Sequence, residues 1–319
     1  MMGAEVKAAP VEMRVVYAET LIRLAEANED IVILEADLMK ASATGIFQKR
    51  FPGRAFNVGV AEANMLGIAA GLSASGKTPF AASFTCFASR RAYDQFFISC
   101  NYSGLSVKLV GTDPGIAAEY NGGTHMCFED IGLMRNVPGV VVFEPCDPVS
   151  LAHLVERAAA HRGSTYLRLH RKPIAPIYGD GEEFELGRGK ILRDGGDVTL
   201  VAAGAIMVPE ALAAADLLGA QGVDAAVIDM HTIKPIDRGL ILRQANRTRG
   251  FVTCENHQVV NGLGSAVAEV LCEMCPRPLR RVGIRDEFGE VGTLDYLKAR
   301  YRLTAEAIAG EALAILQGE

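Results

Sequence analysis

The sequence predicts an α/β protein of two domains, each built on a mostly parallel sheet that helices cover on both faces. Short apolar runs rich in Val and Ile alternate with longer helical patterns along most of the chain. Such alternation is typical of parallel sheets, because the connecting helices pack back onto the sheet. A stretch rich in Pro, Gly and Glu near residue 180 interrupts the pattern and indicates a domain boundary. The 319 residues, half of them apolar, suffice for about two domains.

The first domain is predicted to begin with a helix over residues 13–28 that turns Val16, Leu21, Ile22 and Leu24 inward. Buried strands and helices alternate after it. The predicted organisation is a flexible tail over 1–12, a first domain over 13–175, a linker over 176–192 and a second domain over 193–319. Strands of the first domain are expected at 31–35, 55–58, 79–84, 107–111, 140–144 and 165–169.

The second domain is predicted to be a smaller α/β unit. It repeats the alternation of apolar runs with helical patterns, on a shorter length of chain. Strands are expected at 198–203, 225–229, 250–255 and 279–283, and helices at 209–218, 237–245, 262–272 and 304–316.

Composition indicates a cytoplasmic protein that binds neither nucleic acid nor a membrane. The net charge is −6, which disfavours a polyanionic partner. No apolar run reaches the length of about 18 residues that a membrane span requires. Seven cysteines form no spaced framework, which is typical of reduced thiols. Cys272 and Cys275 form a lone C-x-x-C pair, and zinc needs about four ligands, so no zinc site is expected.

The most informative residue is Glu62, the one carboxylate in an apolar stretch over 57–72. It is placed where a buried strand ends and a helix of small and apolar residues begins. Gly67 and Gly71 in that helix are expected to allow close packing. A helix cap is the simpler interpretation, because acidic residues in the first turn stabilise its exposed amides. A functional carboxylate is the alternative.

Motifs downstream of Glu62 favour the functional interpretation. A second predicted strand leads through Phe84 and Phe87 into a helix with two arginines, and a Gly-Gly-Thr-His loop ends at His125. Together with Glu62, these motifs resemble the pyrimidine-binding domain of transketolase. The resemblance extends from Arg14 to the final helix and matches the C-terminal two thirds of that enzyme.

The resemblance implies that the chain binds thiamine diphosphate. Glu62 matches the glutamate that bonds N1′ of the aminopyrimidine ring, and burial favours the proton-sharing form of such a carboxyl. It would relay a proton to the cofactor, which then holds a two-carbon unit. Phe84 and Phe87 match aromatics that flank the ring, although both would also suit an ordinary core. The resemblance places Asp37, Leu38 and Arg90 in the same cofactor site.

At the substrate end, His125 matches a histidine that bonds the oxygens of the ketose or the acceptor. Glu62 and His125 are therefore the predicted catalytic residues. Asn121 replaces the family's usual aspartate, which puts the usual sugar stereochemistry in question. Arg14 and Arg171 match two arginines that clamp an anionic tail with forked hydrogen bonds.

Asp113 stands where the family has a phosphate-binding histidine. A carboxylate there would repel a dianion or pair with one of the arginines. The expected substrate is thus a sugar or sugar phosphate whose tail differs from the common one or binds in a shifted pose.

The metal-binding part of the family's site has no counterpart in this chain. Gly179-Asp180-Gly181 matches the start of the family's metal motif, but positions 205–215 contain no asparagine, so a solvated turn is predicted. No metal ligand is expected here, and Mg²⁺ or Ca²⁺ would be held by a separate chain with the diphosphate-binding domain. A homodimeric core within an α2β2 assembly is the simplest closed arrangement. The second domain is expected to support that dimer.

We therefore predict the small subunit of a split transketolase, which moves a two-carbon ketol unit from a ketose donor to an aldose acceptor. One rival is the β subunit of a 2-oxoacid dehydrogenase or a deoxyxylulose-phosphate synthase-like enzyme, which shares the Arg-Ala-Tyr-Asp-Gln stretch at 91–95. A non-catalytic scaffold subunit is the other. His125, Arg14 and Arg171 favour ketol transfer.

Overall fold

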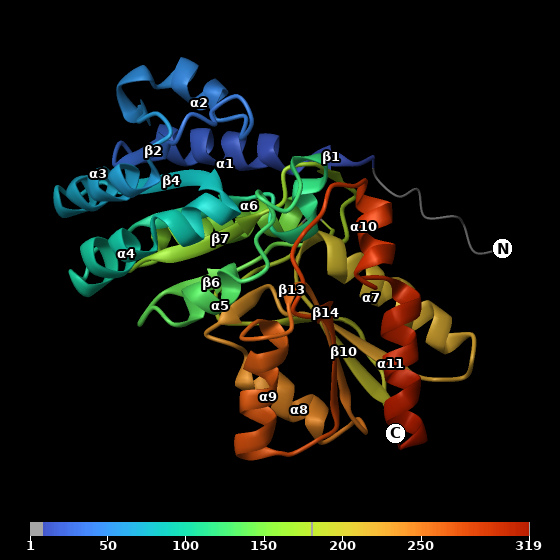
Figure 1. Cartoon of the computed structure of the whole chain (residues 1–319). Coiled ribbons are helices and arrows are strands. Elements are labelled where there is room, and N and C mark those ends of the chain that lie inside the picture. Colours follow the sequence, from blue (N-terminus) through green and yellow to red (C-terminus); the bar gives the residue numbers. More distant parts are fainter. Residues whose placement is uncertain (1–8, 180, 319) are drawn as a thin grey trace.

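The carboxyl ends of six parallel strands share one edge of the first sheet, and this edge carries most of the residues of interest. The computed structural model describes residues 9–179 and 181–318, and Figure 1 shows two sheets with helices on both sides. The first sheet has seven strands in the order β12-β6-β7-β5-β4-β2-β3, and the second has five in the order β14-β13-β10-β11-β9. The predicted fold class is confirmed.

All strands of the first sheet are parallel except β12, which pairs antiparallel with β6. That strand comes from the second half of the chain, so the two halves share a sheet. The strands are β2 (Ile31–Glu35), β3 (Ala55–Asn57), β4 (Thr78–Phe84), β5 (Lys108–Thr112), β6 (Val141–Phe143), β7 (Thr165–Leu169) and β12 (Thr232–Lys234).

Helices of the first half cover both faces of this sheet. In α1 the buried side chains include Tyr17, Leu21 and Ala25, whereas Ile22 and Leu24 lie at the margin of the core. The prediction is therefore right that Leu21 is buried. Val16, Ile22 and Leu24 are only partly buried, because the face of α1 that carries Tyr17 packs into the core. The α-helices are α1 (Met13–Ala27), α2 (Gly45–Arg50), α3 (Glu62–Ala74), α4 (Tyr93–Gln95), α5 (Asp130–Arg135) and α6 (Pro148–Ala160), and the other helical turns are Pro52–Arg54, Phe87–Arg91, Phe96–Tyr102 and Gly115–Asn121.

The second sheet is parallel except for β9, which pairs antiparallel with β11. Helix α7 begins at Gly204, earlier than predicted, and carries Pro209 inside it, because Gly204 takes the left-handed conformation that starts the turn (φ 79°). The elements are β9 (Lys190–Arg193), β10 (Val198–Ala202), β11 (Ala225–Asp229), β13 (Phe251–Gln258), β14 (Leu279–Ile284), α7 (Gly204–Gly219), α8 (Arg238–Ala245), α9 (Leu263–Met274), α10 (Leu294–Arg300) and α11 (Ala305–Gln317).

Two short segments near the predicted boundaries are ordered by strand pairing. β1 (Val11–Glu12), within the predicted tail, pairs antiparallel with β8 (Pro173–Ile174). β9 begins within the predicted linker. Residues 1–8 of the predicted tail and Asp180 of the predicted solvated turn lie outside the described residues.

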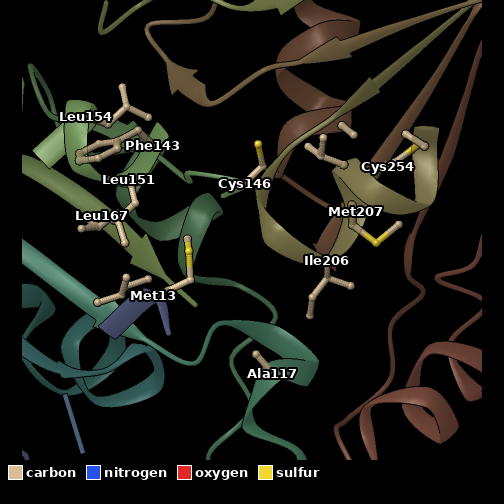
Figure 2. Close-up of a cluster of buried hydrophobic side chains, with 14 of the residues drawn as sticks. Met13, Ala117, Phe143, Cys146, Leu151, Leu154, Leu167, Ile206, Met207 and Cys254 are labelled. Carbon is tan, nitrogen blue, oxygen red and sulfur yellow. The ribbon is translucent and has the colours of Figure 1, made fainter. Parts of the chain in front are cut away.

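The two halves are joined by a continuous apolar core. Figure 2 shows Met13 and Leu167 of the first half and Met207 and Cys254 of the second within one cluster, with Cys146 between them. Close packing of this kind makes the junction stiff. Within the described residues, no helix has the length and apolar character to cross a membrane.

Candidate active site

Parallel strands bring residues that are distant in the sequence to one edge of the first sheet. Glu35 ends β2, Phe84 ends β4, Asp113 follows β5, and Arg171 follows β7. In open α/β sheets, ligands bind at this carboxyl edge. The polar side chains that gather here are therefore the first candidates for a site.

Glu62 is buried at the start of α3, with 2% of its side chain exposed. Its Oε1 accepts a hydrogen bond from Ser83 Oγ at 3.3 Å, and Arg91 Nε lies 3.5 Å from Oε2. Oε2 has no hydrogen-bond partner among the described residues, nor does the carboxyl cap the first-turn amides of α3. A buried polar atom without a partner is unusual and indicates a place for a ligand. Capping alone does not account for this geometry.

Phe84, Phe87 and His125 form an aromatic cluster beside this carboxyl. The ring centroids of the two phenylalanines lie 5.5 and 5.4 Å from that of His125, in edge-to-face contacts. The His125 Nδ1 is within 2.9 Å of Thr124 Oγ1, which fixes the ring orientation. Ser83, which bonds Glu62, immediately precedes Phe84 at the end of β4, so the carboxyl and the aromatic rings lie near the same end of this strand.

Charged residues continue the site beyond Phe84. The guanidinium of Arg171 lies 5.0 Å from the centre of the Phe84 ring and forms an ion pair with Asp113. Asp113 is buried and holds a left-handed backbone conformation (φ 52°), which is rare outside glycine and often marks functional sites. Burial raises the pKa of Asp113 above its usual range, and the Arg171 guanidinium opposes this rise. The sequence left two roles open for Asp113, repulsion of a dianion or an ion pair with one of the arginines. The structure contains the ion pair, with Arg171.

Arg14 closes this end of the site. Its backbone N–H donates to the carbonyl of Arg171 at 3.2 Å, and its Nη1 donates to the carbonyl of Ala41 at 3.2 Å. Its Nε donates to Glu12 at 2.7 Å. Both arginines of the predicted clamp are thus adjacent, and each already has a carboxylate partner.

The hydrogen bonds and ion pairs of the other predicted site residues are made with neighbours outside this cluster. Asp37 is exposed and accepts a hydrogen bond from Asn57 Nδ2 at 3.2 Å, and Leu38 is half-buried in the loop after β2. Asn121 is exposed, and Arg90 donates to the carbonyl of Cys86 at 3.3 Å and pairs with Glu129 at 3.2 Å. No contact recorded for the described residues joins these four side chains to Glu62 or His125.

The sequence reasoning missed Glu35 and His170, which lie at the same edge. Glu35 accepts hydrogen bonds from Ser42 and Thr44, and its Oε2 has no partner among the described residues. Burial raises the pKa of Glu35 to about 7, and burial lowers the pKa of His170 to about 4. An acid directly after the apolar run 31–34 was the signal in the sequence, because a charge at the end of a buried strand has few structural uses.

The cluster fits a flat, nitrogen-containing ring better than a metal ion. Glu62 Oε2 can accept from or share a proton with a ring nitrogen, and Phe84 and Phe87 supply apolar faces beside it. Residues 9–179 and 181–318 contain no group of three or more His, Cys, Asp or Glu side chains placed to hold a metal. The described residues therefore suit the pyrimidine ring of thiamine diphosphate.

Comparisons with known proteins agree with this site. Family profiles of the transketolase pyrimidine-binding domain and the transketolase C-terminal domain match residues 9–175 and 187–308. The 6-deoxy-6-sulfo-D-fructose transketolase subunit SqwH of Clostridium sp. (strain MSTE9) is 53% identical over 304 residues, which cover 95% of this chain and 94% of that protein. A 1-deoxy-D-xylulose-5-phosphate synthase of Heliobacterium modesticaldum is 37% identical, over 92% of this chain but 45% of that protein.

The solved structure of a split gene transketolase, an inactive beta4 tetramer, is similar over nearly the whole chain. It is 42% identical and superposes with a TM-score of 0.88, covering 96% of this chain and 98% of the other.

Proposed function

Because this chain belongs to the transketolase family, as a subunit that carries the pyrimidine-binding and C-terminal domains, we propose that Glu62 and the aromatic cluster form the cofactor half of its active site. The chain is a subunit of a thiamine diphosphate-dependent transketolase. Bound thiamine diphosphate supplies the carbon nucleophile and the electron sink for a two-carbon ketol unit. The buried Oε2 of Glu62, which accepts no hydrogen bond from the described residues, is the observation that carries the assignment of residues.

Each residue of the cluster has a distinct part in this proposal. Glu62 would present Oε2 to a nitrogen of the pyrimidine ring, while Ser83 holds Oε1 by a hydrogen bond. Phe84 and Phe87 would exclude water from a bound ring, which would strengthen its hydrogen bond with the carboxyl. His125, oriented by Thr124, donates to a sugar oxygen. Asp37, Leu38, Arg90 and Asn121 remain predicted contacts at the margin of the site.

A partner chain with the diphosphate-binding domain would complete the site and bring Mg²⁺ or Ca²⁺. The face of α3 that would meet it exposes Ile68, with 37% of its surface accessible, and Gly67 and Gly71. A Cβ atom added at either glycine would meet nothing within 4 Å, so the predicted close packing is not found at these positions among the described residues. Figure 1 shows α3 at the outer side of the first sheet, away from the second. We propose an α2β2 assembly built through this face.

The assembly surface can be tested by one substitution. We expect Gly67→Leu to block association with the partner chain, because a bulky side chain would keep the two backbones apart, while leaving the fold of this chain intact. Light scattering of the mixed chains measures the assembly. Glu26→Gln, at an exposed position of α1, is the control. Normal assembly by Gly67→Leu would contradict the proposed surface.

The activity itself is tested in the reconstituted two-chain enzyme. We expect ketol transfer from a ketose to an aldose, and Glu62→Gln to lower kcat by about 100-fold or more, the scale of lost proton transfer. Turnover that survives in Glu62→Gln would favour the scaffold alternative. Release of CO2 from pyruvate at a rate exceeding ketol transfer would favour the synthase or dehydrogenase alternative. The proposed activity belongs to carbohydrate metabolism. All seven cysteines are free thiols in the structure, which agrees with the predicted cytoplasmic location.

A further inference from the structure

We infer that the Asp113–Arg171 pair makes this transketolase select a ketose whose terminal group carries one negative charge, such as a sulfonate, over the dianionic phosphate. The inference rests on the proposed function, because it assigns the substrate class of that same site. Its basis is the balance of charges around the two arginines at the tail end.

The cations at this end are already matched by acids. Arg171 pairs with Asp113, Arg14 pairs with Glu12, and Lys172 pairs with Glu119. Glu35 adds a fourth carboxyl, whose charged form interacts with Arg171. Each of the three cations is thus paired with a carboxylate, so little positive charge remains to offset a bound dianion.

Asp113 is the group whose charge a bound tail would meet most directly. Its side chain is 2% exposed, and its Oδ1 has no partner among the described residues. It cannot turn away into water, since the loop that follows it is anchored by Asn256. The Asn256 side chain donates to the carbonyl of Pro114 at 2.8 Å and accepts from the amide of Ile116 at 2.9 Å. A carboxylate fixed in this way repels a dianion more strongly than a monoanion.

An anion is nevertheless favoured over a neutral tail. Arg171 is buried to all but 16% of its side chain, and its Nε has no partner among the described residues. A donor of this kind needs an acceptor oxygen. A sulfonate presents three oxygens with a single charge, whereas a phosphate monoester carries about −1.5 to −2 at pH 7. The sulfonate therefore satisfies the donor with less repulsion from Asp113.

The test compares two donors that differ only in the tail, 6-deoxy-6-sulfo-D-fructose and fructose 6-phosphate, in the reconstituted two-chain enzyme. For the sulfonate, we expect kcat/KM at least about tenfold higher, mainly through a lower KM, because juxtaposed like charges weaken binding strongly. In Asp113→Asn we expect the ratio of kcat/KM for the sulfonate to kcat/KM for the phosphate to fall by about tenfold.

Two further variants keep the result independent of a folding defect. Glu12→Gln, on the exposed partner of Arg14, should move the ratio in the same direction by a smaller factor of about two to three. Asp286→Asn is the control, because Asp286 is exposed in the second domain and has a similar backbone conformation (φ 50°). It should leave the ratio unchanged.

The outcomes separate the two proposals. Ketol transfer with equal or reversed donor preference, or an unchanged ratio in both Asp113→Asn and Glu12→Gln, overturns the charge selection alone. Failure of ketol transfer with both donors and with other ketoses overturns the proposed function and this inference with it.

Discussion

Two arginines near the end of β7, Arg168 and Arg171, have opposite surroundings. Arg168 is fully buried, and each of its three side-chain nitrogens donates to Asp130, Glu144 or the carbonyl of Asn256. Tyr166 adds a further hydrogen bond to Asp130 at 2.9 Å. Among the described residues, the side chain of Arg171 forms an ion pair with Asp113, and its Nε has no hydrogen-bond partner. The first arginine is satisfied by the protein, and the second still has a donor to offer.

This difference separates a structural charge from a functional one better than burial does. Both arginines are largely buried, and both pair with a buried acid. What differs is how many of their polar atoms the protein itself satisfies. A complete network stabilises one packing of the two domains, while an incomplete one leaves room for a ligand.

The largest effect expected from this comparison is on stability. Arg168→Met leaves Asp130 and Glu144 buried without a cation, so we expect the free energy of unfolding to fall by about 3–5 kcal/mol. Arg171→Met should lower it by only about 1 kcal/mol, because Lys172 and Arg14 remain near Asp113. Urea denaturation of the two variants measures both values. Equal losses would mean that Arg171 is as structural as Arg168.

The next effect concerns activity at the functional end. We expect His125→Ala to lower kcat/KM by about 100-fold, because a substrate oxygen loses its donor. The free energy of unfolding should change little, since His125 is only half-buried. Steady-state kinetics of the reconstituted enzyme test this. Arg168→Lys is the comparison variant, and we expect it to lower the free energy of unfolding more than His125→Ala does. A large loss of stability in His125→Ala would place this residue with the structural group.

A pH-dependent effect sharpens the comparison at Glu35. Its pKa is raised to about 7 in the folded protein by burial, so the folded state holds a proton that the unfolded state releases near pH 4.5. The resulting stabilisation is fully present below pH 4.5 and is lost as the pH rises through 7. We expect the change in unfolding free energy between pH 4.5 and 8 to be roughly 2–3 kcal/mol smaller in Glu35→Gln than in the wild type.

Urea denaturation at several pH values measures this dependence. Asp229 and Glu255, whose pKa values burial also raises to about 7, should still titrate in the variant. Their contribution serves as an internal control. If the pH dependence of Glu35→Gln equals that of the wild type, Glu35 is already ionised in the folded protein well below pH 7.

The smallest effect is expected at Arg90. This side chain is 46% exposed and pairs with Glu129 at the surface. We expect Arg90→Met to change the free energy of unfolding by less than about 0.5 kcal/mol. Titration of thiamine diphosphate into the reconstituted enzyme then tests whether Arg90 contacts the cofactor, and an unchanged affinity would remove it from the predicted site.

The local sequence determined the fold class and much of the site. Ile31–Glu35 and Thr165–Leu169 form strands where predicted. Residues 31–34 are all apolar, which suits a strand that is buried on both faces. Glu62 was found in the same way, as a single charge at the end of such a run. The sequence did not predict which side of α1 is buried or that nothing packs against Gly67. Periodicity identifies a helix, but it does not say which neighbour the helix meets.

Only the tertiary structure decided which polar groups are satisfied. Asn256 lies in the second domain, yet it holds both Arg168 and the loop that follows Asp113. β12 joins the first sheet from the second half of the chain. Neither relation is visible in the sequence, because hydrogen bonds depend on distances and angles that the packing of distant segments sets. The residue types fix what each side chain can donate or accept, and the packed sheet fixes which atoms remain free for a ligand.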